Sequence, residues 1–460
     1  MSELGILDHT MSDAEGLMWR LENDPFLSSA FANITILDRR PDMDRLLRRM
    51  ERATAAFARL RQRVQPAPAN LSAPKWVDDP AFDLRFHVRH VALPKPGSMR
   101  QLLDLASLIA VDPFDRSRPL WQFWIVDGLR GGKSALVQKM HHSIIDGEGG
   151  IQLSLEYLDF ARDAPEPPPL VPVEEEPPAP SPNIVAEVMR SMLSGSLKVP
   201  LGMVRQMRDV LVDPTGPPQA TFAAAETVRS ILTQLGETDR ARSPLWTERS
   251  LGRRVEVLQA PFGATRDAAR RLGGTLNTAF VTAAAQAAGA YHDRLGHPVE
   301  FLRTSMAIST RTAGSGGNAF TLGRMLVPTG RMRIAERFAL IQAASEAARG
   351  DAAGPSLDTL AGVALALPTS VITRIARTQT QTVDFATSNV RGAPMPVYLA
   401  GAQVLANHPL GPLAGVAFNL TLLSYNHSLD MGVNIDTAAV EEPELLRKLL
   451  ERAFKDLAAA

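Results

Sequence analysis

Two adjacent histidines, His141 and His142, followed by Asp146 and Gly147, are the residues whose types and spacing best suit proton transfer. Histidine accepts a proton near neutral pH, so one of them can serve as general base toward a hydroxyl or an amine. Neighbouring residues of an extended segment point to opposite sides, so only one ring can face a given cleft. The aspartate can orient a ring or brace the loop through a salt bridge.

Other chemistries fit this motif less well. Two histidines and an aspartate are acceptable zinc ligands, but adjacent histidines do not converge easily on one ion. The helical spacing of zinc proteases is absent, and so is the Gly-x-Ser-x-Gly sequence of serine hydrolases. Two hypotheses therefore remain for the motif. One is a base that acts directly on the substrate, and the other is a pair of structural histidines in a core.

The elements around the motif predict a strand, a turn and a helix. Residues 134–138 form an apolar run typical of a buried strand, and residues 119–126 predict the preceding strand of a hairpin. Residues 151–158 carry apolar side chains at helical spacing. Glycines at 147, 149 and 150 mark the turn between strand and helix. Scaffolds commonly mount reactive groups at such a turn.

The rest of the chain alternates between helical and strand patterns. Residues 42–64 predict one long helix whose arginine-rich face is interpreted as solvated surface. Residues 82–93 predict a strand, in which His87 and His90 are interpreted as structural or surface residues. Further strands are expected at 31–37, 253–259, 299–309, 324–327, 397–404, 416–424 and 431–435, and around Phe385. Further helices are expected at 99–110, 264–272, 276–295, 333–349 and 443–457.

Composition divides the chain into two lobes and a linker. Residues 164–182 are rich in proline and glutamate and predict an extended linker. Residues 184–212 follow as amphipathic helix, packed either between domains or on a lipid surface. We therefore predict an N-terminal lobe at 1–163, a linker with amphipathic helices at 164–222, and a C-terminal lobe at 223–460.

The length, net charge and cysteine count of the chain argue against several classes of protein. The chain has 460 residues, a formal net charge of zero and no cysteine. Zero net charge disfavours a nucleic-acid partner, and the lack of cysteine removes disulfides and thiolate chemistry. We find no signal-peptide pattern and no apolar run near 20 residues, so the expected location is cytoplasmic. The amphipathic stretch adds peripheral contact with the inner membrane face or a lipid droplet to that expectation.

Several segments together resemble one enzyme family. The sequence from His141 to Gly147 resembles the His-His-x-x-x-Asp-Gly signature of acyl-CoA-dependent acyltransferases and condensation domains. Residues 76–90 and the Pro-Leu-Trp at 119–121 resemble segments of bacterial wax ester synthase/diacylglycerol acyltransferases. Residues 388–390 and 421–425 resemble later motifs of that family. The likeness covers nearly the whole chain apart from the linker.

The resemblance implies a fold and a reaction. The fold would be the α/β (α+β) architecture of chloramphenicol acetyltransferase, with two lobes and the active-site channel between them. His142 would be the general base, while His141 and Asp146 would support the turn. The base would deprotonate a long-chain alcohol or diacylglycerol, whose oxygen attacks acyl-CoA without a covalent acyl-enzyme. Neither a cofactor nor a metal is implied, and acyl-CoA is a substrate.

The resemblance also assigns residues in the second half of the chain. Asn277 would stabilise the oxyanion or shape the channel, although a helix N-cap is an equally good interpretation of this residue. Ser424 is a weaker oxyanion candidate. The substrate-binding residues would be Gly147, Ser388, Asn389, Ser424 and Tyr425.

Three departures from the family pattern fall in the same half. Thr278 stands where the family has aspartate, Arg391 interrupts the Asn-Val-Pro-Gly-Pro motif, and Asn426-His427 replace small residues. They leave the base in place and affect the region that would grip the acceptor. Two alternatives therefore stay open: a condensation-type transferase that uses carrier-bound acyl groups, and a lipid-binding relative with reduced catalysis.

Overall fold

The computed structural model describes residues 10–66, 73–145, 147–167, 241–309, 320–351, 361 and 369–460. These residues all belong to one compact unit. Asp146, most of the predicted linker and the amphipathic stretch 184–212 lie outside the described residues. The predicted boundaries at 163 and 222 therefore stay predictions.

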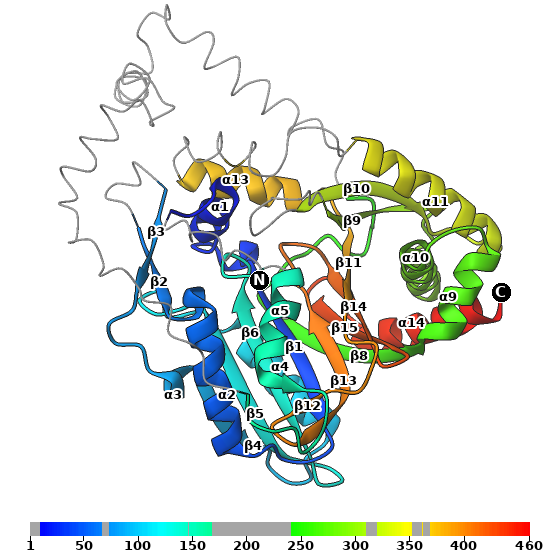
Figure 1. The fold of residues 1–460 in the computed structure, drawn as a ribbon. Coiled ribbons are helices and arrows are strands. Elements are labelled where there is room, and N and C mark those ends of the chain that lie inside the picture. The colour runs from blue at the N-terminus through cyan, green and yellow to red at the C-terminus, as the bar shows by residue number, and fades with distance from the viewer. Residues whose placement is uncertain are drawn as a thin grey trace, which may run out of the picture. The chain divides into compact units, whose positions relative to one another are not determined.

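The first sheet carries the histidine motif. It has seven strands in the order β4-β5-β6-β1-β13-β12-β7 (Figure 1). Their bounds are β1 (Ala30–Leu37), β4 (Val88–Ala92), β5 (Trp121–Leu129), β6 (Lys133–His141), β7 (Leu158–Asp159), β12 (Tyr398–Leu399) and β13 (Ala402–Leu410). Helix α4 (Met99–Val111) packs on one face, against Ala32, Ile34 and Val137. Helices α2 (Met43–Ala56) and α5 (Gly147–Tyr157) cover the opposite face, against Trp121, Phe123 and Leu136.

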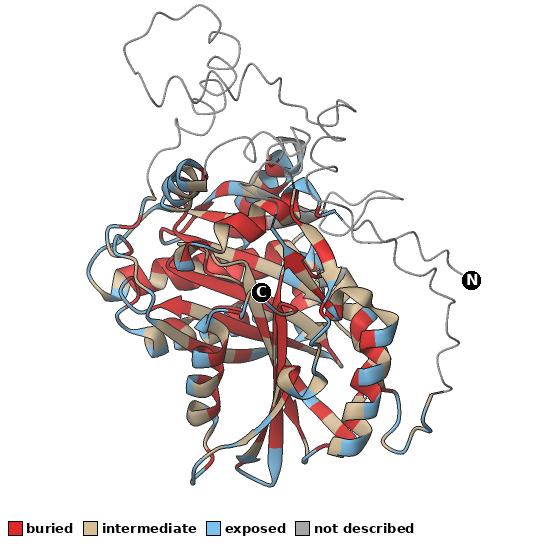
Figure 2. Ribbon diagram, turned by 90° about the vertical axis from the view of Figure 1, so that its left-hand side faces the viewer, coloured by how far each residue is buried: buried red, intermediate tan, exposed pale blue. Residues whose placement is uncertain are grey.

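The second sheet has six strands in the order β10-β9-β11-β14-β15-β8. Their bounds are β8 (Arg253–Pro261), β9 (Phe301–Ser309), β10 (Phe320–Pro328), β11 (Phe385–Arg391), β14 (Phe418–Tyr425) and β15 (Ser428–Asp436). Helices α9 (Phe262–Arg271), α10 (Leu276–Arg294), α11 (Ile334–Asp351) and α14 (Pro443–Ala459) lie together beside this sheet (Figure 1). Helix α10 is alanine-rich and largely buried, as its composition predicts, and Figure 2 shows the buried residues concentrated along the strands.

Strand β13 joins the two sheets. It comes from the second half of the chain, yet it pairs antiparallel with β1, with Ala32 opposite Leu410. It also touches the second sheet, where the Asn407 N–H donates to the Asp430 carboxylate at 2.7 Å. At this crossing a Cβ on Gly432 would lie 2.1 Å from the Pro409 carbonyl oxygen. Only glycine therefore allows the backbones to approach this closely.

The two-lobed α/β architecture is confirmed, and most predicted elements are present within a few residues. Three predicted elements were wrong in extent. The helix expected at 42–64 ends at Ala56, because residues 62–65 form β2 (Gln62–Gln65) and pair with β3 (Lys75–Asp78). The strand expected at 82–93 begins with a helical turn, α3 (Leu84–His87), which Asp83 caps by accepting from the Arg85 N–H.

The third error is the single strand expected at 397–404. A turn at Ala400 and Gly401, with φ of 45° and 84°, divides it into β12 and the start of β13. Helix α13 (Thr369–Thr380) was not predicted at all. Helix α1 (Asp13–Leu21) was not predicted either, although Ser12 and Glu15 have the spacing of a capping box and form one in the structure.

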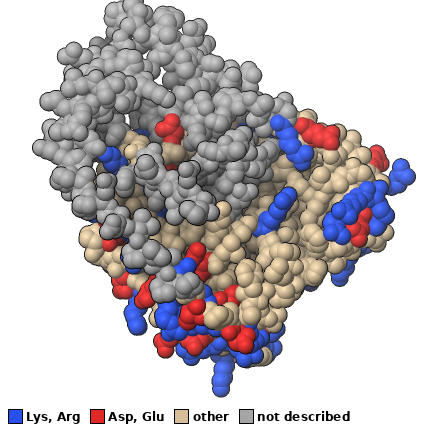
Figure 3. Space-filling model, in the orientation of Figure 1, with Lys and Arg blue, Asp and Glu red and all other residues tan. Residues whose placement is uncertain are grey.

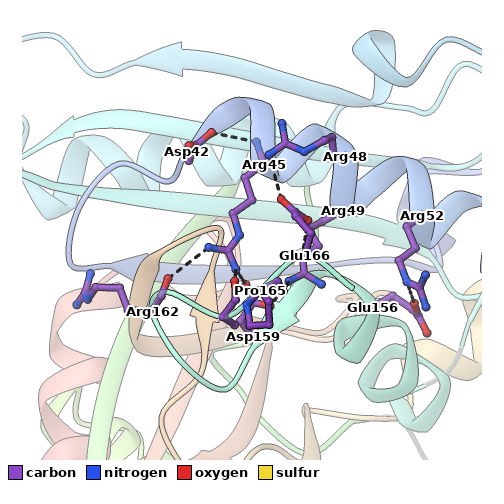
Figure 4. A network of polar contacts seen from close by, with 11 residues as sticks. Asp42, Arg45, Arg48, Arg49, Arg52, Glu156, Asp159, Arg162, Pro165 and Glu166 are labelled. Atoms are coloured by element: carbon purple, nitrogen blue, oxygen red, sulfur yellow. Dashed lines mark hydrogen bonds and ion pairs between the residues drawn. The ribbon is translucent and has the colours of Figure 1, made fainter. Parts of the chain in front are cut away.

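The arginine-rich face of α2 is not a solvated surface, which corrects the sequence interpretation (Figure 4). Arg45 donates to the Asp159 carboxylate and to the Ala164 carbonyl, both at 2.6 Å. Arg49 donates to the other Asp159 oxygen and to the Pro165 carbonyl. Asp159 and Arg49 are buried, so these bonds fix the path of the chain after α5. We call this group of contacts the arginine network.

A two-histidine turn at the end of the first sheet

The histidine motif lies where β6 ends. His141 is the last residue of β6 and pairs with Ala30, the first residue of β1. Leu410 of β13 faces Ala32, so this is also the end of the sheet from which β13 leaves toward the second sheet. The chain then turns, with the Ile144 N–H donating to the His141 carbonyl at 3.0 Å, and α5 begins at Gly147. The strand, turn and helix therefore occur in the predicted order.

His141 is fully buried and bonded at both ring nitrogens. Its Nδ1 accepts from the Ser143 backbone N–H at 3.1 Å and lies 2.7 Å from the Ser143 hydroxyl. Its Nε2 lies 3.1 Å from the Glu22 carboxylate. A backbone N–H can only donate, so Nδ1 carries the lone pair and the hydrogen belongs on Nε2. His141 thus donates to Glu22.

Glu22 was not identified from the sequence. It lies directly after α1, 119 residues before His141 in the chain. Its carboxylate also accepts from the Ser28 hydroxyl at 2.7 Å and the Ser29 N–H at 2.8 Å. Burial raises the pKa of Glu22, but the bonds from His141, Ser28 and Ser29 outweigh burial and leave that pKa below its ordinary value. No spacing or motif connects this residue to the histidines.

His142 has different surroundings. Its backbone N–H donates to the Ser29 carbonyl at 3.2 Å, and its side chain is half-buried. The ring lies against Phe31 of β1, with 4.6 Å between ring centroids and 42° between planes. One histidine is therefore enclosed and bonded to a carboxylate, while the other is partly accessible beside an aromatic ring.

A buried lysine lies behind the motif. Lys139, two residues before His141, donates to the Asp112 carbonyl, and its ammonium lies 4.3 Å from the Phe114 ring centroid. Burial lowers the pKa of Lys139 to about 8, against the opposing effect of Asp112 and Glu22. Lys139 is thus a buried ammonium close enough to Glu22 for the carboxylate to affect its pKa.

His87 and His90 have structural contacts, as predicted. His87 is fully buried, stacks on Trp121 at 4.6 Å between centroids, and donates from Nδ1 to the Trp121 carbonyl at 2.7 Å. Burial lowers its pKa to about 4. His90 lies 2.6 Å from the Asp127 carboxylate at a half-exposed position.

Asn277 lies in the first turn of α10, in the second lobe. Its amide donates to the Met306 sulfur at 2.8 Å. The N-cap interpretation of Asn277 was wrong, because Thr275 is the cap and its hydroxyl accepts from the Thr278 N–H. The oxyanion role of Asn277 stays a prediction. Among the described hydrogen bonds, the side chain of Asn277 is bonded to Met306 and that of His141 to Glu22.

Three of the remaining predicted residues, Ser388, Asn389 and Ser424, lie on two neighbouring parallel strands. Ser388 and Asn389 are on β11, half-buried and exposed respectively, and pair with Thr421 and Leu422 of β14. Ser424, near the end of β14, accepts from the Gly392 N–H at 3.4 Å. Gly147 begins α5 in the first lobe. The structure thus places these residues at the β11–β14 pair and at the start of α5.

Tyr425 is the last residue of β14 and is buried in the core of the first lobe. Its hydroxyl accepts from the Val397 N–H at 3.1 Å and donates to the Val404 carbonyl at 2.9 Å. These bonds engage the hydroxyl with the backbone around β12 and β13. Its predicted contact with substrate stays a prediction.

The departure at Asn426 and His427 is a tight hairpin turn between β14 and β15. Tyr425 pairs with Ser428, and the two residues between them have φ of 40° and 66°. Two consecutive positive φ values define the turn that suits the twist of a hairpin, and asparagine tolerates them better than most residues. This departure therefore has a structural explanation.

Two further features are the distribution of charge on the surface and the length and apolar content of the helices. On the visible face in Figure 3, basic and acidic side chains are interspersed rather than gathered in one basic patch. Among the described residues, none of the helices has the length and apolar content needed to cross a bilayer.

Comparison with known proteins identifies one family along the chain. The family of wax ester synthase/diacylglycerol acyltransferase catalytic domains matches residues 11–280, and the corresponding C-terminal domain matches residues 316–458. A Mycobacterium tuberculosis protein named as a diacylglycerol O-acyltransferase is 32% identical, over 99% of this chain and 92% of its own length. A second protein of that name and organism is 30% identical, over 87% and 85%.

Solved structures show the same architecture. The wax ester synthase/diacylglycerol acyltransferase of Marinobacter aquaeolei VT8 aligns with a TM-score of 0.66 at 21% identity, covering 98% of this chain and 100% of that one. The starter condensation domain of rhizomide synthetase, in complex with C8-CoA, aligns with a TM-score of 0.56 at 12% identity, covering 98% and 95%. The family match spans both lobes, so the chain belongs to the wax ester synthase/diacylglycerol acyltransferase family and is an acyltransferase.

Proposed function

We propose that this chain transfers an acyl group from acyl-CoA to the hydroxyl of a long-chain alcohol or diacylglycerol, with His142 as general base. The observation that carries the proposal is the match of both family domains along the chain, with the His-His-x-x-x-Asp-Gly sequence in the first. Relatives named as diacylglycerol O-acyltransferases support the acceptor class. The related condensation domain in complex with C8-CoA supports acyl-CoA as donor.

The proposed reaction needs one base and two substrates. His142 takes the proton from the acceptor hydroxyl while the oxygen attacks the thioester carbonyl carbon. The carbon–sulfur bond then breaks, and the leaving thiolate of coenzyme A takes the proton from His142. No acyl-enzyme forms, and the proton and acyl group balance without a cofactor or metal. A positioned general base contributes roughly 10²- to 10⁴-fold to the rate.

Other residues have proposed supporting roles. His141 and Asp146 hold the turn, and Asn277 stabilises the oxyanion, with Ser424 as the weaker candidate. Gly147, Ser388, Asn389, Ser424 and Tyr425 are the proposed substrate-binding residues. Because both acceptors are lipids, we include peripheral action at a membrane or lipid-droplet surface, with residues 184–212 as the contact.

Release of coenzyme A from palmitoyl-CoA tests the proposal. Purified wild type would be compared with His142→Ala across a panel of fatty alcohols and diacylglycerols. The expected loss of turnover in His142→Ala is about 10²- to 10⁴-fold. His297→Ala, at an exposed histidine in the second lobe, is the matched control and should retain wild-type turnover. Equal release by wild type and His142→Ala would reject the assigned base.

The condensation-domain likeness supports a second candidate. A condensation-type transferase would take its acyl group from a tethered carrier, and the same assay with acyl-carrier protein in place of palmitoyl-CoA distinguishes the two donors. A catalytically reduced lipid-binding protein would bind liposomes and release no coenzyme A with any acceptor. Liposome binding that survives deletion of residues 184–212 would reject that stretch as the lipid contact.

A further inference from the structure

We propose that Glu22 is a positioning residue for His142, because its carboxylate holds the two-histidine turn from both sides. The inference rests on the proposed role of His142 and adds a residue that the motif does not contain. Glu22 touches the ring of His141 rather than that of His142. It therefore acts through its neighbours and does not take part in the chemistry.

The first contact runs through the ring of His141. Glu22 accepts from Nε2 at 3.1 Å, and this leaves Nδ1 to accept from the Ser143 N–H at 3.1 Å. The bond at Nε2 thus sets the tautomer that the bond at Nδ1 requires. His142 lies between His141 and Ser143 in the chain, so its backbone is held on both sides by one imidazole. If the ring of His141 rotated, or carried its hydrogen on Nδ1 instead of Nε2, it would no longer hold the backbone of His142.

The second contact runs through the backbone of Ser29. Glu22 accepts from the Ser28 hydroxyl at 2.7 Å and from the Ser29 N–H at 2.8 Å. The carbonyl of the same Ser29 accepts from the His142 N–H at 3.2 Å. One carboxylate therefore fixes both His141, the residue before the reacting ring, and the backbone of Ser29, to which the backbone N–H of His142 is bonded.

The segment that presents Glu22 is itself fixed. The Glu22 N–H donates to the Met18 carbonyl at the end of α1. Arg116 donates to the Trp19 carbonyl at 3.0 Å, and its guanidinium lies 3.5 Å from the centre of the Trp19 ring. The side chain of Glu22 is only 13% exposed, so water competes little with His141, Ser28 and Ser29 for the carboxylate oxygens. Because the carboxylate is itself held in place, it can hold the residues of the turn in place.

Three variants separate the shape of Glu22 from its charge. Glu22→Gln keeps the length, and its amide can still accept from His141 and Ser29 while donating to the Ser28 hydroxyl. Glu22→Asp keeps the charge but shortens the reach by one methylene. Glu22→Ala removes both. Glu451→Gln, at an ion pair with Arg447 on α14, is the matched control.

Turnover of palmitoyl-CoA is the first readout. We expect kcat to fall about 10- to 100-fold in Glu22→Asp and Glu22→Ala, because a small displacement of a reacting group has an effect of this size. Glu22→Gln should stay within about fivefold of wild type, and KM for palmitoyl-CoA should change little in all variants. A general loss of folded structure would instead lower the active fraction and leave kcat per folded molecule unchanged. The reverse ranking, with Glu22→Asp active and Glu22→Gln inactive, overturns the proposal.

Diethyl pyrocarbonate footprinting, read by mass spectrometry, is the second readout and does not depend on turnover. In wild type and Glu22→Gln, His141 should resist modification because it is enclosed and its Nε2 is bonded. In Glu22→Asp and Glu22→Ala, His141 should become reactive. An unchanged footprint overturns the proposed positioning role of Glu22, whatever the enzyme acts on. Loss of turnover in His142→Ala with no effect of any Glu22 variant would reject this inference and leave the proposed function standing.

Discussion

One group of buried polar contacts holds the turn before α5, another holds the chain after α5, and the two groups are built differently. The group before α5 uses one carboxylate, Glu22, to hold an imidazole and two serines. The arginine network after α5 uses two guanidiniums, Arg45 and Arg49, to hold one carboxylate and several backbone carbonyls (Figure 4). The first fixes the position of a ring, and the second fixes the path of the chain.

The difference predicts different consequences for activity and stability. Removing one partner from the arginine network leaves a buried charge unpaired, and this is strongly destabilising. The bonds of Glu22 end on a turn of a few residues, where geometry matters more than total bond strength. Damage to the arginine network should therefore lower the free energy of unfolding, and damage around Glu22 should lower turnover.

The largest predicted effect on stability is at Asp159. Asp159→Ala leaves Arg45 and Arg49 without their shared carboxylate, and the free energy of unfolding should fall by about 3–5 kcal/mol. The expected kcat per folded molecule stays within about twofold of wild type. Urea unfolding measures the first quantity and turnover at low temperature the second. Asp267→Ala, which removes the exposed partner of Arg266 on α9, is the control and should cost less than about 1 kcal/mol.

That comparison fails if Asp159→Ala lowers kcat tenfold under conditions where the protein is fully folded. Such a result would mean that the position of α5, and not only that of the chain after it, depends on the arginine network. The two groups of contacts would then act as one.

A second prediction concerns acid and the buried His87. Its Nδ1 is bonded to the Trp121 carbonyl, while its Nε2 is buried with no hydrogen-bond partner among the described residues. Its pKa is lowered by burial to about 4, below the ordinary value of 6.5. Between these pH values the unfolded chain binds a proton that the folded chain does not, so stability falls as pH falls. The loss by pH 4 should be on the order of 3 kcal/mol.

Urea unfolding between pH 7 and 4 measures this slope. His87→Phe should give a flatter slope, because the ring contacts remain and the titrating group is gone. His297→Ala, at an exposed position, should keep the wild-type slope. If His87→Phe is as acid-sensitive as wild type, the acid sensitivity arises elsewhere, and carboxylates with lowered pKa such as Glu22 become the better explanation.

The sequence predicted what is local. The strand and helix that flank the histidines have clear periodicity, so their order and type were predictable, and the glycine-marked turn between them was too. Helices α9, α10, α11 and α14 of the second lobe were predicted from the same kind of local pattern, whereas α13 was not predicted. The errors occurred where distant residues override a local pattern, as in residues 62–65, which pair with β3 instead of continuing α2.

The contacts that matter most around the motif are not local. Glu22 meets His141 across 119 residues, and Thr35 of β1 meets Asn407 of β13 across 372. Periodicity and spacing carry no information on such pairs. The arginines of α2 looked like a solvated surface because their partners lie more than 100 residues away. Buried salt bridges of this kind become visible only when the fold is known.

The smallest predicted effect tests whether the second half of the chain supports the group of contacts around Glu22. Arg377 of α13 binds both oxygens of Asp24, a buried residue two positions after Glu22, and lies 4.7 Å from the centre of the Phe26 ring. The hydrogen bonds from Arg377 are the main reason that the pKa of Asp24 lies below its ordinary value. Arg377 itself is half-exposed, so water can partly replace it.

We therefore expect Arg377→Ala to lower the free energy of unfolding by only about 1–2 kcal/mol. Turnover should fall about two- to fivefold, because the segment 22–29 that carries Glu22 loses one of its attachments. Arg374→Ala, an exposed arginine one turn earlier on α13, is the control and should match wild type in both measurements. A fall in turnover without a change in stability would show that α13 acts on the turn through Asp24. A fall in stability alone would confine its role to folding and leave Glu22 to position the turn without help from the second lobe.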